Sequence, residues 1–405
     1  MMTARQVRLT EFAQESAVAL SPEERDGIRR LHPGLRMEPS SGREGHYDLT
    51  PDEHVGLISL PSVVVQIQPK IPMSSVFFLI SYACDSIAWL EGRPELARSA
   101  DLTDVLALLL ARSVQHATRR GLFNGYVTHE EALPAPRGRL LFSEQIRKRM
   151  RVSSPVEVRH DVFTADVLEN RLLLAAVAAM LRLPLNSAAA RHELRRAERL
   201  FGDVSRLHFQ AAAVPDVVIT RLNRHYAAPL ALSGLILRSM AVDLATSQAV
   251  HGAAFLVNMN AVFERFVRIA LRAALGVRAN EFPDRPSPMH LDQRDVVSFV
   301  PDLVLLRNGR VIWVGDAKYK RLAVRGYQNA DLYQMLAYSV TMNLPGGMLI
   351  YAADRGLSSV DHVVRRSGKR LQVRTLDLSM PPNAILAQVQ ALADHVKASV
   401  SAVAA

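Results

Sequence analysis

The stretch that decides the fold is Pro301-Asp-Leu-Val-Leu-Leu-Arg-Asn-Gly-Arg-Val-Ile-Trp-Val-Gly-Asp-Ala-Lys318, in which Asn-Gly separates two short apolar runs. An Asn-Gly pair between two such runs is a strong signal for a β-hairpin. Because a hairpin reverses the chain, Asp302 before the first strand and Asp316 after the second return to the same end. Lys318 lies two residues beyond Asp316, on the same face of an extended strand. The stretch therefore predicts two carboxylates and an ammonium in one place.

This combination of side chains suits a divalent-metal site that cuts phosphodiesters. Mg²⁺ prefers one or two carboxylates together with waters and phosphate oxygens, and Asp302 and Asp316 supply the carboxylates. A metal at this position polarises the scissile phosphate and lowers the pKa of an attacking water. Lys318 then orients that water or stabilises charge on the phosphorane. The plainer interpretation is that strand ends carry charges for solubility.

Two helical segments offer further candidates. Glu264 interrupts the edge of an apolar helical face, where it either pairs with an arginine or takes a direct or supporting role at a metal. Gln334 and Tyr338 are four residues apart and share one helix face. Their hydrogen-bonding groups suit a phosphate, a base edge or the lysine, although Tyr338 could equally pack in the core.

Composition limits the class of protein. The chain has 405 residues, 49% of them apolar and 22% charged, with a formal net charge of +10. That charge fits a polyanionic partner such as nucleic acid, and it is also common in basic proteomes. Cys84 is the only cysteine, which excludes an intrachain disulfide and a cysteine zinc site and fits a reducing cytoplasm. None of the 13 histidines shows a His-x-x-x-His or mixed His/Cys spacing, so no zinc site is predicted.

No membrane association is expected. The longest apolar run, Leu172–Leu181, is far shorter than the roughly 20 residues that span a bilayer. The N-terminus lacks the apolar region of a signal peptide. We therefore expect a cytoplasmic protein.

The periodicity predicts a multidomain α+β protein. A β-rich unit over 1–72 is followed by a mainly helical region over 73–252 and an α/β domain over 253–405. Ser21 and Glu24 form the pattern of a capping box at a helix start. A Gly/Pro-punctuated segment at 121–142 is expected to project as an extended hairpin or loop. Other expected helices are 76–90, 102–120, most of 166–260, 253–275, 327–342 and 382–397, and later strands are 348–351 and 371–377.

At this point a family resemblance becomes specific. The pattern Pro301-Asp302…Asp316-Ala317-Lys318 resembles the PD-(D/E)xK nuclease superfamily, and Gln334-x-x-x-Tyr338 resembles the extra motif of its RecB-like branch. Outside that domain, the chain resembles the McrC family, the nuclease subunits of McrBC modified-cytosine restriction systems. The segments that carry this resemblance are Val55–Leu60, Ile67–Ile71, Pro136–Leu140, His160–Leu173 and Asn258–Glu264.

The resemblance implies a restriction-endonuclease-like fold for residues 253–405 and a set of roles. Cleavage is implied for Asp302, Asp316 and Lys318, with Glu264, Gln334 and Tyr338 in support. A Mg²⁺ or Mn²⁺ ion is implied at Asp302, Asp316, the backbone carbonyl of Ala317 and Glu264.

The resemblance also implies partners, namely an McrB-like AAA+ GTPase ring and double-stranded DNA with modified cytosine. The chain contains no Gly-x-x-x-x-Gly-Lys-[Ser/Thr], so it should not hydrolyse nucleotide alone. Residues before about 250 would then dock on the ring, with segment 121–142 as the candidate contact. Basic residues at Arg137, Arg139 and 147–149 would face the partner, DNA or solvent, and the basic helix over 191–206 is either DNA-facing or merely amphipathic.

The leading hypothesis is a Mg²⁺-dependent DNA endonuclease that both requires and stimulates a GTPase ring. One alternative is an activator and assembly adaptor with weak or lost nuclease activity, which would bind no Mg²⁺ or Mn²⁺ through Asp302 and Asp316. Another is a stand-alone RecB-like nuclease, which would cut DNA without any GTPase.

Overall fold

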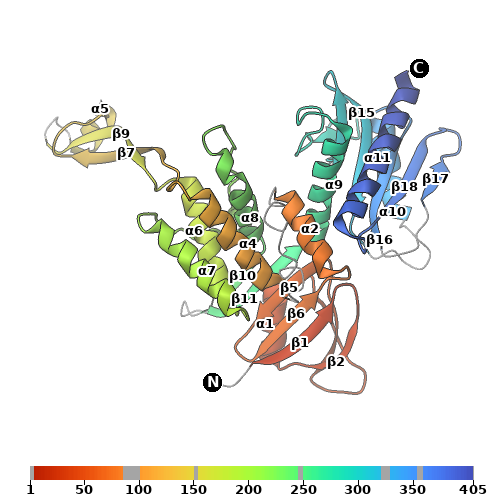
Figure 1. Ribbon diagram of the computed structural model, residues 1–405, viewed down its shortest axis with the longest axis horizontal. Helices are drawn as coiled ribbons and strands as arrows, with labels where there is room; N and C mark the ends of the chain where they lie inside the picture. Colours follow the sequence, from red (N-terminus) through yellow and green to blue (C-terminus); the bar gives the residue numbers. More distant parts are fainter. Residues whose placement is uncertain are drawn as a thin grey trace. The chain divides into compact units, whose positions relative to one another are not determined.

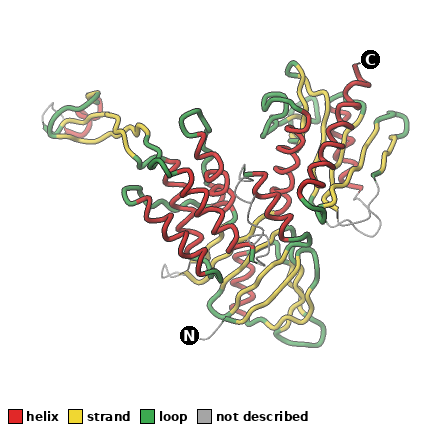
Figure 2. Tube along the Cα trace, in the orientation of Figure 1, coloured by secondary structure: helices red, strands yellow, loops and turns green. Residues whose placement is uncertain are grey.

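The computed structural model describes residues 4–84, 101–149, 154–244, 250–320, 329–353 and 359–404. The chain forms two compact units (Figure 1). Unit 1 contains Met1–Leu102 and Ala241–Ala405, and unit 2 contains Thr103–Met240. Unit 2 is therefore inserted within the sequence of unit 1. Helices and strands are mixed in both units, as Figure 2 shows, so the fold is α+β. Among the described residues, no helix is long and apolar enough to cross a membrane.

The first sheet of unit 1 is built mainly from the N-terminal part of the chain. Its strand order is β1 (Arg5–Thr10), β6 (Val63–Gln68), β5 (His54–Ser59), β11 (Val250–Asn258) and β10 (Met240–Leu244). Helix α1 (Pro22–Leu31) packs its apolar side into the core of this sheet. Ser21 and Glu24 make both hydrogen bonds of the predicted capping box. A smaller sheet beside it has the order β2 (Glu15–Ala19), β4 (His46–Thr50) and β3 (Arg36–Pro39).

The prediction of helix through residues 253–258 was wrong. This segment is strand β11, and helix α9 (Met259–Leu275) begins only after Asn258, whose side chain accepts a hydrogen bond from Ala261 N at 2.9 Å. The apolar run before Asn258 has no period that separates a buried strand from a helix. Antiparallel pairing with β5, which lies almost two hundred residues earlier, decides the conformation. Gly56 permits that pairing, since a Cβ there would lie 2.0 Å from Phe255 O.

The second sheet of unit 1 contains the predicted hairpin. Its order is β14 (Leu303–Arg307), β15 (Arg310–Lys318), β16 (Gly346–Ala353), β18 (Arg370–Asp377) and β17 (Val360–Val363). Strands β14 and β15 are antiparallel, and Asn308 and Gly309 have φ angles of 51° and 76°, which confirms the Asn-Gly turn. Strands β15, β16 and β18 run parallel to one another. A short pair, β12 (Met289–His290) and β13 (Ser298–Phe299), precedes the hairpin.

Helices cover this sheet. Helix α9 and helix α11 (Pro382–Ala404) pack on each other and on β15, and Figure 1 shows α11 crossing the sheet. Helix α10 (Asn329–Thr341) inserts Met335 and Tyr338 into a core with Val314 and Leu349. The strands and helices predicted after residue 327 are thus confirmed where the structure describes them, with longer bounds for the C-terminal helix.

Contacts made by helices and loops join the first and second sheets of unit 1. Helix α2 (Met73–Ala83), the described part of the predicted helix 76–90, packs on α9 through Phe78 and Phe266, whose ring centroids are 5.6 Å apart. The remainder of that prediction, 85–90, lies outside the described residues. Tyr319 follows β15, and its hydroxyl donates to Glu11 Oε1 at 2.6 Å, just after β1. The end of the hairpin is therefore attached to the first sheet.

Unit 2 combines a helical bundle with a long β-ribbon. The bundle contains α4 (Leu102–Ala117), α6 (Leu168–Leu181), α7 (Ala188–Glu198) and α8 (Ala227–Arg238), with 3₁₀ turns at Arg199–Phe201, Ala211–Ala213 and Arg224–Tyr226. The ribbon contains β7 (Gly125–Leu133), β9 (Val156–Thr164), β8 (Arg139–Leu140) and helix α5 (Phe142–Arg149), and Figure 1 shows it reaching away from the helices of its unit.

The ribbon refines the prediction for segment 121–142. That segment does extend, but β7 pairs along its whole length with β9 rather than within 121–142. Only the two-residue strand β8 follows the Pro-rich turn, and it too pairs with β9. The partner strand is far along the sequence, so local turn signals could not identify it.

Candidate nuclease centre and partner-docking ribbon

The hairpin brings Asp302, Asp316 and Lys318 together. Asp316 and Lys318 lie on β15, and Lys318 Nζ is 2.6 Å from Asp316 Oδ2. Asp302 directly precedes β14, and its Oδ2 accepts a hydrogen bond from Ala317 N at 3.0 Å. Asp316 is 1% exposed, whereas part of the Lys318 side chain reaches solvent. The predicted side chains therefore meet at one end of the hairpin, with an ammonium beside two carboxylates.

Burial and charge repulsion control the protonation of Asp316. Removal from water is the largest effect, and the neighbouring Asp302 carboxylate adds to it, so the pKa of Asp316 rises to about 7. Lys318 opposes this rise but does not cancel it. Burial tends to lower the pKa of Lys318, but the charges of Asp316 and Asp302 outweigh it, so its pKa is raised and it remains an ammonium. A second cation near Asp302 and Asp316 would relieve the repulsion between them.

Glu264 faces the same group of charges from helix α9. Burial, followed by the charge of Asp302, raises the pKa of Glu264, which places its carboxylate close to the hairpin end. Arg268, one helical turn later, pairs with Glu264, and Arg268 Nε also donates to the backbone oxygen of Asp302 at 3.1 Å. Glu264 therefore pairs with an arginine, as one of the two alternatives predicted. Its direct or supporting role at a metal stays a prediction.

Gln334 and Tyr338 approach from helix α10. Gln334 Nε2 donates to the Tyr338 hydroxyl at 2.8 Å, and the Tyr338 ring stacks on Phe299 with centroids 4.8 Å apart. Burial and the charges of Asp316 and Asp302 raise the pKa of Tyr338, so its hydroxyl stays neutral. Tyr338 thus belongs to the core and also faces the acidic pair.

Several neighbours of this centre were missed by sequence reasoning. Asp331 is buried in the first turn of α10, where Lys320 Nζ lies 2.9 Å from Oδ1 and the Tyr351 hydroxyl donates to Oδ2 at 2.6 Å. For Arg268, its position four residues after Glu264 is a local signal that could have predicted the ion pair between them. No comparable signal exists for Asp331. Lys320 follows β15 and Tyr351 lies on β16, so no short motif connects them with Asp331.

The glycine at position 315 is explained by packing. A Cβ at Gly315 would lie 2.4 Å from the Trp313 ring, on the same face of β15. The absent side chain therefore leaves room for the indole, which stacks near Phe282 with centroids 6.4 Å apart. This packing supports the strand on the face opposite Asp316.

The ribbon of unit 2 is held firmly at its base. The Tyr226 hydroxyl accepts a hydrogen bond from Phe123 N at 2.9 Å, and Asn170 Nδ2 donates to Phe123 O at 2.8 Å. Next to Asn170, Arg171 makes two hydrogen bonds of 2.7 and 2.8 Å to Asp166. The segment 160–173, singled out in the sequence, therefore fixes the direction in which the ribbon leaves the helices.

The far end of the ribbon exposes apolar side chains. On α5, Phe142 and Ile146 are 55% and 59% exposed and lie four residues apart, so they share one helix face. The neighbouring cations are partly neutralised, because Arg147 pairs with Glu144 and Lys148 Nζ lies 3.0 Å from Glu157. An exposed apolar face on a firmly based ribbon is suited to contact with another protein.

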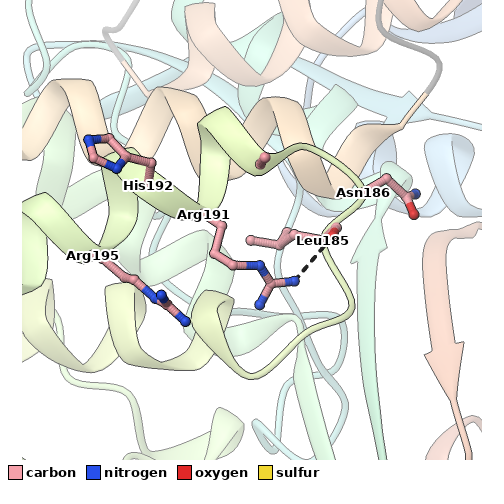
Figure 3. Close-up of a pocket in the computed structure, with 6 residues that line it drawn as sticks. Leu185, Asn186, Arg191, His192 and Arg195 are labelled. Atoms are coloured by element: carbon pink, nitrogen blue, oxygen red, sulfur yellow. Dashed lines mark hydrogen bonds between the residues drawn. The ribbon is translucent and has the colours of Figure 1, made fainter. Parts of the chain in front are cut away.

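A shallow pocket of about 380 Å³ lies at the start of α7, lined by Leu185, Asn186, Ala188, Arg191, His192 and Arg195 (Figure 3). Arg191 bends back so that its guanidinium donates to Leu185 O at 3.1 Å, as Figure 3 shows. Helix α7 buries Ala190, Leu194 and Ala197 and exposes its basic side, so it is amphipathic. The helix predicted over 191–206 is shorter than expected, because α7 ends at Glu198.

Comparison with known proteins gives a consistent result. A model of the family described as McrBC 5-methylcytosine restriction system components matches residues 49–352 of this chain. One relative is the type IV methyl-directed restriction enzyme EcoKMcrBC of Escherichia coli strain K12, which is 22% identical over 303 residues. That match covers 70% of this chain and 86% of the relative.

The fold also has a solved counterpart. A chain in the refined half-complex from the tetradecameric assembly of Thermococcus gammatolerans McrB AAA+ hexamers with bound McrC superimposes with a TM-score of 0.56 at 20% identity. The match covers 96% of this chain and 100% of that chain. At this identity the likeness concerns the fold, which both chains share over almost their whole length.

Proposed function

Because this chain belongs to the family of McrBC 5-methylcytosine restriction system components, we propose that it is the McrC-like endonuclease subunit of a modification-dependent restriction system. In this proposal it hydrolyses phosphodiester bonds of double-stranded DNA with modified cytosine, in the cytoplasm, with Mg²⁺ or Mn²⁺ and an McrB-like AAA+ GTPase ring. The observation that carries the proposal is the approach of Asp302, Asp316 and Lys318 at one end of a hairpin, with Glu264 facing them.

The donor set fits a hard divalent cation. Mg²⁺ binds carboxylate and carbonyl oxygens, which here are Asp302, Asp316, Glu264 and the backbone oxygen of Ala317. Asp316 Oδ2 is buried, and the Lys318 ammonium lies 2.6 Å from it. Because Lys318 does not cancel the effect of burial on the pKa of Asp316, a divalent cation at this oxygen would further stabilise the ionised form. When bound, the metal would supply Lewis-acid activation of a phosphate and of a water.

The residues around the metal ligands position the reacting groups and stabilise the charge that develops on the phosphate. Lys318 lies where its ammonium can orient an attacking water or stabilise negative charge on the phosphorane. The Ala317 N–H fixes the rotamer of Asp302, and Arg268 fixes both Glu264 and the backbone at Asp302. Gln334 and the neutral Tyr338 offer hydrogen bonds to a phosphate oxygen or to Lys318. These supports keep the three central side chains in place while DNA enters.

In this proposal the two units have different roles. Unit 1 carries the cleavage centre, and the ribbon of unit 2 docks on the GTPase ring through Phe142 and Ile146 of α5. The absence of a phosphate-binding Gly-x-x-x-x-Gly-Lys-[Ser/Thr] motif from the sequence places nucleotide hydrolysis on the partner. Recognition of the modified base is likewise assigned to the partner.

The decisive experiment separates cleavage from partner stimulation. With ring, GTP, Mg²⁺ and methylated DNA present, Asp316→Asn and Lys318→Ala should each lower the cleavage rate at least about a hundredfold. Stimulation of the partner's GTPase should remain within about twofold of wild type, since the ribbon is unchanged. Asp295→Asn, an exposed residue of unit 1 with a positive φ that asparagine tolerates, is the matched control. Cleavage by Asp316→Asn at the wild-type rate would refute the site.

A further inference from the structure

Three metal-ligating side chains meet outside the nuclease centre. His32 caps the C-terminal end of α1, Asp52 lies in the turn between β4 and β5, and His54 is the first residue of β5. One nitrogen of each imidazole and one oxygen of Asp52 all lie within 4.8 Å of one another. The two rings meet edge to face, with centroids 5.2 Å apart. We call these three residues the His–Asp–His cluster.

The buried member of the cluster lacks a partner that would justify its burial. The His32 side chain is 4% exposed, and its Nε2 has no hydrogen-bond partner. That nitrogen lies 3.4 Å from Asp52 Oδ1, within the range of an ion pair but too far for a strong hydrogen bond. Burying a ring nitrogen without a well-formed hydrogen bond is unfavourable. The cost disappears if the nitrogen binds a cation held between His32 and Asp52.

The surroundings leave room for Asp52 to take this position. A Cβ at residue 34 would lie 2.1 Å from Asp52 Oδ2, and the residue is Gly34. Asp52 Oδ1 also accepts from His54 N at 3.0 Å and lies 2.8 Å from His54 Nδ1. The backbone therefore holds the carboxylate between the two rings.

The donors select the class of metal. Two imidazoles and one carboxylate suit Zn²⁺ and its first-row neighbours, whereas Mg²⁺ prefers oxygen ligands alone. Zinc bonds of about 2.0–2.1 Å at the tetrahedral angle place ligand atoms about 3.3 Å apart. The 3.4 Å between His32 Nε2 and Asp52 Oδ1 matches this spacing, and the 2.8 Å to His54 Nδ1 needs to widen by roughly half an ångström when the shared proton leaves. Asp52 and His54 are both part-exposed, which leaves the fourth position open to water.

We propose that the His–Asp–His cluster binds one Zn²⁺ ion, separately from the Mg²⁺ proposed at the hairpin. The ion would join the end of α1 to the turn before β5. That turn is itself bonded to the start of α9, because Met259 N donates to Glu53 O at 3.0 Å. One residue later, the Asn260 side chain accepts from Tyr319 N at 3.1 Å, directly after Lys318. Zinc would thus fix the helix that carries Glu264 at the end nearest the first sheet.

In the alternative state of the cluster, no metal is bound and a proton is shared between His54 and Asp52. In that state His54 Nδ1 donates to Asp52, and the Asn258 amide faces the ring's Nε2 at 3.4 Å. The proton-held state predicts no stoichiometric binding of zinc. It also leaves His32 Nε2 unsatisfied, which is why we favour the metal.

The test titrates the full-length, metal-stripped chain with Zn²⁺ in the presence of excess Mg²⁺ and a competing chromophoric chelator. We expect one equivalent of zinc to bind wild type, and at least tenfold weaker binding in His32→Gln, His54→Gln and Asp52→Asn. The matched controls are His46→Gln, a histidine of the neighbouring strand β4, and Asp316→Asn at the nuclease centre. Both controls should bind like wild type, and Co²⁺ should give a visible spectrum that His54→Gln abolishes.

The outcomes separate the possibilities. Absence of stoichiometric zinc binding to wild type overturns the site, as does binding that the cluster variants leave unchanged. Loss of zinc in Asp316→Asn, with retention in the cluster variants, would place the ion at the nuclease centre and equally overturn it. If the buried variant His32→Gln fails to fold by circular dichroism, the more exposed His54→Gln decides. A rise in melting temperature with Zn²⁺ in wild type, absent in His54→Gln, is the second measurement.

Discussion

The surroundings of Asp316 disfavour the ionised form of its carboxyl group. Its pKa of about 7 arises from burial first and from the Asp302 charge second. At neutral pH this carboxyl group is about half protonated even beside Lys318, and a bound metal cation would favour its ionised form. Metal binding and deprotonation of Asp316 should therefore be linked.

This linkage predicts the pH dependence of stability. A carboxyl group whose folded-state pKa is raised contributes stability below its unfolded pKa of about 4, and that contribution is lost as pH rises through about 7. In urea unfolding without metal, wild type should therefore lose about 2 kcal/mol more than Asp316→Asn between pH 5.5 and pH 8. Mg²⁺ should restore part of the loss in wild type only. An equal pH dependence of the two proteins would contradict the raised pKa.

At this scale the sequence identified the central residues but not their surroundings. Asp302, Asp316 and Lys318 were predictable because one local turn brings them together. Asp331 and the His–Asp–His cluster were not predictable from spacing. His32 and His54 come from different elements, and only the packing of α1 on the first sheet brings them together. The prediction of no zinc site considered short spacings only.

The ribbon is the element with the clearest consequence for a partner. Truncating Phe142 and Ile146 together to alanine should raise the chain concentration needed for half-maximal GTPase stimulation by at least about thirtyfold, since exposed anchors each contribute roughly 1–2 kcal/mol. Val218→Ala with Leu222→Ala is the control, because both residues are exposed in the same unit. Unchanged stimulation by the α5 double variant would remove α5 from the docking surface.

A second element depends on one glycine. Gly56 has a φ of 143°, and a Cβ there would meet Phe255 O at 2.0 Å, so Gly56→Ala should separate β5 from β11. We expect a loss of at least about 2 kcal/mol in the free energy of unfolding, measured in urea. Gly42→Ala is the comparison, since its φ of 78° carries the backbone strain with nothing within 4 Å. A similar loss in both variants would mean that backbone strain, and not strand separation, is responsible.

Local signals explain which elements the sequence predicts. The Asn-Gly hairpin and the capping box of α1 depend on a few adjacent residues, and both are present. Strand β11 and the pairing of β7 with β9 depend on partners that lie far away in the sequence. Their apolar patterns are compatible with more than one conformation, so tertiary pairing decides.

At the scale of the whole molecule, the sequence predicts cleavage that depends on a second protein. The isolated chain should hydrolyse GTP no faster than background, and with Mg²⁺ it should cut methylated DNA at least about a hundredfold more slowly than with ring and GTP. Initial rates of supercoiled plasmid cleavage provide the measurement. Fast cleavage by the chain alone would favour a stand-alone nuclease of the RecB-like kind.

The order of domains along the chain was harder to predict than the elements. Composition suggests three consecutive parts, over 1–72, 73–252 and 253–405. Contacts instead group the two ends of the chain into one unit, because β11 and α9 belong with the first sheet and with α2. The sequence of residues 240–258 contains no local signal that this segment pairs with a strand almost two hundred residues earlier.

The insertion of unit 2 within unit 1 has a genetic consequence. A single in-frame exchange between residues 102 and 241 would replace the whole of unit 2, while every strand of the sheet that contains the hairpin is retained. By contrast, a gene fragment that starts at residue 259 would separate α9 from β11 and would lack every strand of the first sheet. Under the function proposed above, such an exchange would combine one cleavage centre with different partner proteins, and the two units could diverge at different rates.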